Sequence, residues 1–171
     1  GYEVDSLDVN TSNKRWEIID NKLVPPLTTI KGLGDAAIDE IMLKRPFLSV
    51  EDLLFDKGVI ARKVNKKSLD AMCRAGAMES LMDERFFGSK HFWSAVVVDK
   101  PKNKKKLGEN IKKYKKEGNF SKGEQINHLQ ALTGIYPINM VVPVKAYKFF
   151  ESQGIMPLSE YNRELGKGWC I

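Results

Sequence analysis

The spacing of hydrophobic residues predicts a chain built mainly of short helices. Between residues 27 and 45, apolar residues recur at intervals of three and four, which is the period of an amphipathic helix. Gly32-Leu33-Gly34 interrupts this pattern, and Pro25-Pro26 prevents a regular helix from beginning earlier. We therefore predict two short helices joined by a tight turn, the second beginning near Asp35 and ending before Pro46.

A second glycine-containing turn follows further along the chain. Ser49, with an acidic residue three positions later, predicts a short capped helix. Asn65 caps the next predicted helix, which ends at Ala75-Gly76-Ala77 before another helix begins. The order helix, glycine-containing turn, helix thus occurs twice, 43 positions apart when counted from Gly34 to Ala77.

The flanking sequence has shorter and less regular patterns. Residues 1–24 are expected to be irregular or short-stranded, with Asp20-Asn21 as a turn. Further helices are predicted over four ranges: 86–98, 109–116, 125–132 and 144–153. The last four residues, 168–171, are typical of the start of a strand that has no partner, so we interpret the chain as a segment of a longer protein.

One lysine-rich stretch gives the chain its net charge of +6. Residues 100–122 hold ten lysines and two acids, whereas residues 1–99 hold 14 basic and 16 acidic residues. A block of one sign binds polyanions in some proteins and is a solvated, poorly ordered connector in others. Both interpretations stay open, although the absence of arginine from the block argues against bidentate phosphate recognition.

Composition excludes several classes of protein. No apolar run approaches the ~20 residues of a membrane span, and there is no signal-peptide pattern at the N-terminus. The two cysteines lie 97 positions apart, which argues against a disulfide scaffold or a thiolate zinc site and suits a reducing cytosol. No nucleotide-binding glycine loop and no converging set of carboxylates is recognisable. We therefore predict no catalytic residue, no metal and no cofactor in this segment.

The turn between the first two predicted helices carries the most informative chemistry. Glycine permits positive φ and a close approach of the backbone to a ligand. At a helix N-terminus, the free amides of Gly32, Leu33 and Gly34 can converge on one anionic oxygen, while the Leu33 side chain turns inward. Such a turn grips a nucleic-acid phosphate without reading base sequence. The alternative is an ordinary tight helical turn.

The second turn, at Gly76, has a single glycine and is a degenerate copy of the first. A plain left-handed helix stop is the alternative explanation for it. Two phosphate-binding turns in one unit can contact both strands of a duplex across the minor groove.

Residues 1–82 resemble the segment that follows the fingers of the bacterial replicative DNA polymerase III alpha subunit, a C-family polymerase. The matching strings occur in the same order: Gly1-Tyr2-Glu3-Val4, Asp8-Val9-Asn10-Thr11-Ser12, Ile30-Lys31-Gly32-Leu33-Gly34-Asp35-Ala36-Ala37, Pro46-Phe47-Leu48-Ser49-Val50-Glu51-Asp52-Leu53, Val64-Asn65-Lys66-Lys67-Ser68-Leu69 and Arg74-Ala75-Gly76-Ala77-Met78-Glu79-Ser80-Leu81. In that family the region is a tandem helix-hairpin-helix unit that grips duplex DNA behind the active site.

The resemblance implies which residues contact DNA. The backbone of Lys31, Gly32, Leu33, Gly34 and Asp35, and that around Gly76 and Ala77, is expected to contact phosphates. Lys66 and Lys67 are expected to make supporting contacts. The metal-binding aspartates of the family lie in its palm, upstream of this segment, so the segment itself is expected to be non-catalytic although its parent chain resembles a DNA-directed DNA polymerase.

The resemblance is looser downstream. Residues 132–139 resemble a segment that precedes the OB-fold domain of the family, although Ile135-Tyr136 replaces its histidine. The family also carries a short peptide that binds the sliding clamp, of which no clear copy exists here. Residues 125–129 lie in about the right place, but an amphipathic helix turn explains them better.

The sequence therefore predicts an all-α fold and a DNA-binding function. The predicted parts are an irregular lead-in (1–24), a tandem helix-hairpin-helix unit (25–82), a helical extension (83–99), a lysine-rich connector (100–123) and a small helical region leading to a missing OB-type domain (124–171). The predicted partners are double-stranded DNA, the rest of the polymerase chain and, on a weak signal, the sliding clamp. The expected location is the cytoplasm, with the nucleoid.

Two alternative functions are compatible with parts of the sequence. A helix-hairpin-helix base-excision glycosylase needs an aspartate shortly after the hairpin, and Asp52 lies 18 residues after Gly34. Ser49 and Asp52 are better explained as a helix cap. The second alternative is a stand-alone repair or ribosomal adaptor that binds nucleic acid through its hairpins and a lysine tail.

Overall fold

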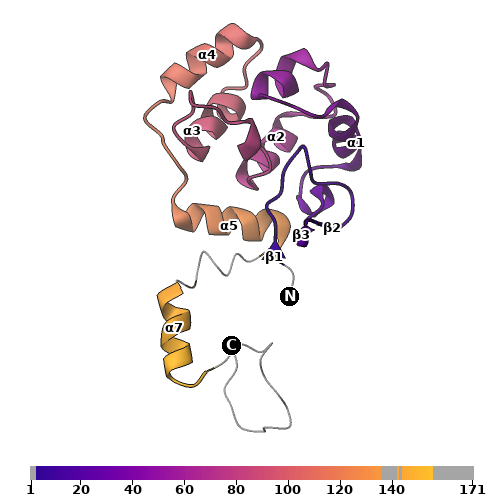
Figure 1. Ribbon diagram of the computed structural model, residues 1–171. Coiled ribbons are helices and arrows are strands. Elements are labelled where there is room, and N and C mark those ends of the chain that lie inside the picture. The colour runs from indigo at the N-terminus through magenta and orange to yellow at the C-terminus, as the bar shows by residue number, and fades with distance from the viewer. Residues whose placement is uncertain (1–2, 136–141, 143, 156–171) are drawn as a thin grey trace. The chain divides into compact units, whose positions relative to one another are not determined.

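Helices are the main regular elements of the structure, a computed structural model that describes residues 3–135, 142 and 144–155 (Figure 1). The chain divides into two units, residues 1–135 and 136–171. The helices are α1 (Asp35–Lys44), α2 (Lys66–Arg74), α3 (Ser89–Trp93), α4 (Lys104–Lys113), α5 (Lys122–Thr133) and α7 (Val144–Ser152). The described residues also contain two 3-10 turns, η1 (Leu27–Thr29) and η3 (Glu79–Leu81), and two π-helical turns, η2 (Asp52–Asp56) and η4 (Ser94–Val98).

The prediction of a helical fold is confirmed, and a small three-stranded sheet accompanies the helices. Its strands are β1 (Glu3–Val4), β2 (Glu17–Ile19) and β3 (Lys22–Val24), in the order β1-β3-β2. β2 and β3 form a hairpin whose two turn residues, Asp20 and Asn21, have φ of 49° and 61°. A two-residue turn with both φ positive matches the twist of a hairpin, which explains why aspartate and asparagine occupy it.

The first predicted hairpin forms around Gly32-Leu33-Gly34, but its first helix is shorter than expected. η1 is a single 3-10 turn, because Pro25-Pro26 fixes an extended backbone immediately before it. α1 begins at Asp35 and ends at Lys44, close to both predicted limits. A proline disfavours helical backbone angles at the residue before it, so α1 ends ahead of Pro46.

The caps predicted for the next two helices are present. Asn65 Oδ1 accepts hydrogen bonds from the amides of Lys67 and Ser68, at 2.9 and 3.1 Å, and so begins α2. Ser49 Oγ accepts from the Asp52 amide at 3.3 Å, and Asp52 Oδ2 accepts from the amide of Leu48 at 2.8 Å. Asp52 is therefore a capping residue in this fold.

The lysine-rich residues 100–123 were predicted to be a connector, but they contain a helix that belongs to the core. α4 begins at Lys104, capped by Asn103, rather than near residue 109. Leu107, Asn110 and Ile111 on one side of α4 are buried. The burial of two aliphatic side chains spaced four residues apart supplies the driving force that the surrounding lysines conceal in the sequence.

Two further helices, α3 and α5, begin at residues that differ from the predicted starts. The helix predicted over 86–98 begins at Ser89, since Gly88 with φ of 156° interrupts the backbone before it. α5 begins at Lys122, three residues before the predicted start, because Ser121 and Glu124 form a capping box. α5 ends at Gly134, whose φ is 72°.

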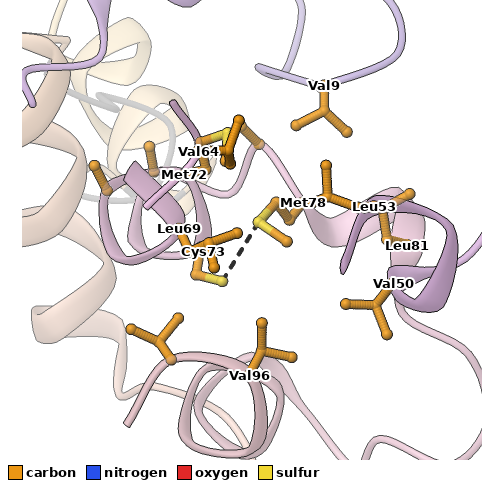
Figure 2. Packing of buried hydrophobic residues seen from close by; sticks show 14 of the residues in the cluster. Val9, Val50, Leu53, Val64, Leu69, Met72, Cys73, Met78, Leu81 and Val96 are labelled. Atoms are coloured by element: carbon orange, nitrogen blue, oxygen red, sulfur yellow. Dashed lines mark hydrogen bonds between the residues drawn. The ribbon is translucent and has the colours of Figure 1, made fainter. Parts of the chain in front are cut away.

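One hydrophobic cluster joins these elements (Figure 2). Leu69 and Cys73 of α2 face Met78, and Val96 of η4 lies opposite them. The Cys73 Sγ lies 3.6 Å from Met78 Sδ, and burial raises the pKa of the Cys73 thiol. Cys73 is thus a packing residue rather than a reactive thiol.

The second unit is described through α7. Tyr147 and Phe150, which were predicted to point inward, are half-buried, and Phe149 is 60% exposed. The predicted strand at 168–171 and the second half of the segment 132–139 lie outside the described residues, as does Cys170. No helix in the described part of the chain is long and apolar enough to cross a membrane.

We predict that Leu69→Ala lowers the free energy of unfolding by about 2–5 kcal/mol, because it leaves a cavity at a side chain that is 1% exposed. Urea denaturation of the 171-residue chain measures the change. The matched control is Leu48→Ala at a side chain that is 84% exposed, where the expected loss is below about 0.5 kcal/mol. Equal losses in the two variants would contradict the described core.

Candidate nucleic-acid interface

The Gly32–Gly34 turn presents its backbone to solvent. Gly32 has φ of 95°, a conformation that side-chain-bearing residues rarely adopt, and Leu33 is buried beneath the turn. Gly34 is the N-cap of α1, and no side chain caps this helix. Lys31, Gly32, Gly34 and Asp35 are all exposed. The turn therefore places an open helix N-terminus at the surface.

The amides available at this turn differ from the set that was predicted. The Leu33 amide donates to the Ile30 carbonyl at 3.1 Å, and the Lys31 amide donates to the Leu132 carbonyl of α5 at 2.7 Å. Within the described residues, four amides have no acceptor: those of Gly32, Gly34, Asp35 and Ala36. The donors that remain for an anion are thus centred on Gly34 and the first turn of α1.

A surface hollow of about 550 Å³ lies beside this turn. Gly32, Gly34 and Ala36 line one part of it, and Arg62, Lys63 and Asn65 line another. Arg62 and Lys63 are exposed residues of the loop that precedes α2. Two cationic side chains and the open N-terminus of α1 therefore surround one space of a size that admits a phosphate group.

Lys67 of α2 lies directly against the turn. A Cβ built on Gly32 would lie 3.4 Å from Lys67 Cε and 3.9 Å from Ala71 Cβ. Lys67, one of the predicted supporting lysines, is therefore beside the glycine turn. Lys66, the other, is directed elsewhere, since its Nζ donates to the Val98 carbonyl at 3.0 Å and ties α2 to η4.

Glu40 holds the cationic loop in place. Its side chain on α1 is 1% exposed, its Oε1 accepts from the Ile60 amide at 3.1 Å, and its Oε2 accepts from Lys63 Nζ at 2.8 Å. The Lys63 hydrogen bond holds the pKa of the Glu40 carboxyl below its ordinary value, against the opposing effect of burial. Both ends of the loop that carries Arg62 are thus fastened to α1.

Sequence reasoning missed Glu40, Arg62 and Lys63. A signal for Glu40 was present, because it occupies the face of α1 that also carries Ala37 and Ile41. A charged residue on a buried helix face needs a partner, and that partner is cationic. Nothing in the local sequence indicated that residues 60–63 fold back toward Gly32.

In the second glycine turn, the amides of Gly76 and Ala77 are hydrogen-bonded to carbonyls of the preceding helix. The Gly76 amide donates to the Cys73 carbonyl at 3.2 Å, and the Ala77 amide donates to the Met72 carbonyl at 2.9 Å. Ala77 is fully buried and its carbonyl accepts from the Val9 amide at 2.8 Å. This arrangement is a helix stop with a left-handed glycine at φ of 80°, the alternative that the sequence left open.

The predicted DNA-binding residues consequently form two groups. Lys31, Gly32, Gly34 and Asp35 belong to the first turn, which lies against Lys67 of α2, with Leu33 buried under it. Gly76 and Ala77 follow the C-terminal end of α2, a helix of nine residues that is roughly 13 Å long.

Asp8 and Asp39 have structural roles. Asp8 Oδ1 accepts from the Asn10 amide at 2.7 Å, and Asp39 forms an ion pair with Lys14. Among the described residues, no group of three or more His, Cys, Asp or Glu side chains is placed to hold a metal ion. Gln125, in the stretch compared with a clamp-binding peptide, donates its amide to the Phe120 carbonyl at 2.9 Å.

Comparison with known proteins supports the helix-hairpin-helix interpretation of the first 86 residues. Residues 1–86 match the family described as the helix-hairpin-helix motif. The chain is 32% identical over 117 residues to the DNA polymerase III subunit alpha of Borreliella burgdorferi, which covers 64% of this chain and 10% of that protein. It is 40% identical over 88 residues to the PolC-type DNA polymerase III of Bacillus subtilis, which covers 49% of this chain and 6% of that protein.

A third relative, the DNA polymerase III subunit alpha of Pseudomonas fluorescens, is 34% identical over 80 residues, covering 46% of this chain and 7% of that protein. The resemblance drawn from the sequence is thereby confirmed. The chain spans a tenth or less of the length of these curated relatives.

We predict that Glu40→Gln flattens the acid limb of the stability profile. Because folding lowers the pKa of Glu40, its contribution is fully present above the ordinary value of 4.5 and is lost as pH falls through the folded value. Urea midpoints measured from neutral pH down to about pH 3 should therefore fall more steeply for the wild type than for the variant. Glu84→Gln, at an exposed residue, should keep the wild-type profile. Parallel profiles for the wild type and Glu40→Gln would show that this carboxylate does not anchor the loop.

Proposed function

Because the chain belongs to the helix-hairpin-helix motif family, we propose that its first unit binds the phosphate backbone of duplex DNA at the Gly32–Gly34 turn. The observation that carries the proposal is the set of unpartnered amides at the N-terminus of α1, beside the hollow lined by Arg62 and Lys63. An anionic oxygen in that hollow would accept hydrogen bonds from the backbone and lie close to Arg62 and a helix dipole, while the charge of Lys63 is paired with Glu40.

The proposed binding is independent of base sequence. The donors at the turn are backbone amides, which are the same whatever the base pair, and the nearby cations suit phosphate oxygens. Glycine at positions 32 and 34 lets a bulky sugar-phosphate chain approach the backbone, since nothing lies within 4 Å of a Cβ built on Gly34. The second turn has a supporting role in this proposal, because its amides at Gly76 and Ala77 are already bonded within the fold.

The relatives indicate where such a segment acts. They are alpha subunits and a PolC-type DNA polymerase III, and the matched part is a small fraction of each. We propose that the chain is a non-catalytic segment that holds duplex DNA for a replicative polymerase, in the cytoplasm and with the nucleoid. The chemistry of nucleotide transfer would be carried out by other parts of such a polymerase.

The proposal does not include a contact with the sliding clamp. Residues 125–129, which lie in about the place where the family carries its clamp-binding peptide, are part of α5, and the Gln125 side chain is bonded to the Phe120 carbonyl. His128 in the same stretch packs edge-on against the Phe120 ring, with centroids 4.8 Å apart. A stand-alone adaptor for RNA remains the alternative function, and the binding experiment below includes duplex RNA to test it.

We predict that Gly34→Val weakens duplex DNA binding about tenfold or more, because its side chain enters the hollow and blocks charge-assisted hydrogen bonds. Fluorescence anisotropy of the 171-residue chain on labelled duplex DNA, single-stranded DNA and duplex RNA measures it. The backbone tolerates this change, since Gly34 has φ of −80° and open space at its Cβ position.

The matched control is Gly123→Val, at another glycine with no atom within 4 Å of a built Cβ. This variant should bind duplex DNA as the wild type does. Unchanged binding by Gly34→Val, or an equal loss in both variants, would refute the hairpin site. Preference of the wild-type chain for duplex RNA would favour the adaptor function.

A further prediction concerns Arg62, which the structure adds to the site. If Arg62 contacts one phosphate, Arg62→Gln should reduce the slope of log K against log salt concentration by about 0.9, equally for unrelated duplex sequences. Arg15→Gln makes the same change in net charge at an exposed residue outside the hollow and should leave the slope unchanged. A slope that does not respond to Arg62→Gln, or a response that depends on the sequence of the duplex, would remove Arg62 from the phosphate site.

A further inference from the structure

α4 has two faces of opposite character. Its inner face, made by Leu107, Asn110 and Ile111, is buried. At 100° per residue, Lys105 and Lys112 point to the side opposite these three residues. Both lysines are exposed, and they lie seven positions apart, so they form one stripe along the outer face.

The helix that carries this stripe is fixed firmly to the unit. Asn110 Nδ2 donates to the Ala95 carbonyl at 3.0 Å, and it also donates to the Asp99 carbonyl. On the neighbouring residue, the Ile111 carbonyl lies 2.8 Å from His91 Nε2. The lysines are therefore displayed on an ordered helix, so little conformational entropy of the backbone is lost when a ligand binds them.

Acidic residues neutralise the lysines at the edges of α4 but not those of the stripe. Lys104 lies 2.7 Å from Asp56, and Lys113 lies 3.2 Å from Asp99. Lys106 lies 3.7 Å from both Asp99 and Glu109. Within the described residues, Lys105 and Lys112 form no ion pair. Two further exposed lysines, Lys115 and Lys116, follow in the turn after α4.

The chemistry of this face identifies its partner. Protein interfaces depend on buried aromatic, arginine or aliphatic anchors, and the outer face of α4 offers only lysines and Glu109. A partner that is bound by charge alone, at several points along a line, is a polyphosphate chain. We propose that Lys105 and Lys112 form a second binding surface for the backbone of nucleic acid, separate from the Gly32–Gly34 turn.

The test is a salt series with the 171-residue chain and labelled duplex DNA, between about 50 and 200 mM salt. The double variant Lys105→Gln, Lys112→Gln should reduce the slope of log K against log salt concentration by about 2, the value for two lost phosphate contacts. Glu109→Gln should bind more tightly than the wild type, because it removes an exposed acid from the same face. Circular dichroism verifies that each variant is folded.

The matched control is the double variant Lys104→Gln, Lys113→Gln, which changes the net charge equally but removes lysines that are already paired. The proposal would be overturned if the Lys105 and Lys112 variant kept the wild-type slope of log K against log salt concentration. It would also be overturned if both double variants reduced this slope equally. Poly-glutamate serves as a second probe, standing for an acidic protein. If the Lys105 and Lys112 variant loses binding to poly-glutamate but keeps its binding to DNA, the partner is an acidic protein and the proposal is also overturned.

The experiment separates this surface from the hairpin site. If Gly34→Val weakens binding and the stripe variant does not, the hairpin site stands and the α4 surface is refuted. If the stripe variant reduces the slope and Gly34→Val binds as the wild type does, the reverse holds. A wild-type chain that does not bind duplex DNA overturns both.

Discussion

The hydrogen bonds of residues 8–13 fix the two glycine turns relative to each other. The Val9 amide donates to the Ala77 carbonyl of the second turn at 2.8 Å. One residue later, the Asn10 side chain bonds both backbone groups of Phe47, donating to its carbonyl at 2.9 Å and accepting from its amide at 2.8 Å. Asn13 accepts from the Leu27 amide, which begins η1 ahead of the first turn. Because this one stretch satisfies donors and acceptors from both hairpins, a shift of either hairpin would leave polar backbone groups unpaired, at a cost of about 1–3 kcal/mol for each group that stays buried.

The same principle extends from the backbone to the site. Glu40 is a buried carboxylate on a helix whose other inward residues are apolar, and it is stable there because Ile60 and Lys63 hydrogen-bond to it. Those bonds also determine where Arg62 lies, beside the hollow at Gly32 and Gly34. The cationic side of the proposed phosphate site is therefore a consequence of satisfying one buried charge. On the other side of the turn, α5 holds the backbone of Lys31, because the Leu132 carbonyl accepts a hydrogen bond from the Lys31 amide.

Features set by neighbours in sequence were predictable, and features set by distant partners were not. The Asn65 cap, the Ser49 cap and the limits of α1 depend on residues within four positions, and each could be derived from the sequence. The pairing of Asn10 with Phe47 spans 37 positions and that of Glu40 with Lys63 spans 23, so no local pattern indicates either. α4 is an intermediate case. Its aliphatic spacing was visible, but the lysines around it are equally compatible with a solvated connector, and only the contacts with α3 and η4 decide between them.

The two glycine turns look alike in sequence, yet they leave different backbone groups without partners. The first turn precedes the N-terminus of α1, whereas the second follows the C-terminus of α2. Gly34 opens α1, so the amides of Gly34, Asp35 and Ala36 lack partners within the described residues. Gly76 follows the C-terminus of α2, so its amide and that of Ala77 turn back to satisfy the last carbonyls of that helix. The helix that begins after it, η3, has only three residues and therefore a small dipole. A repeated turn is thus not a repeated site. Of the two turns, the first precedes a helix of ten residues and leaves amides without partners, whereas the amides of Gly76 and Ala77 in the second are bonded within the fold.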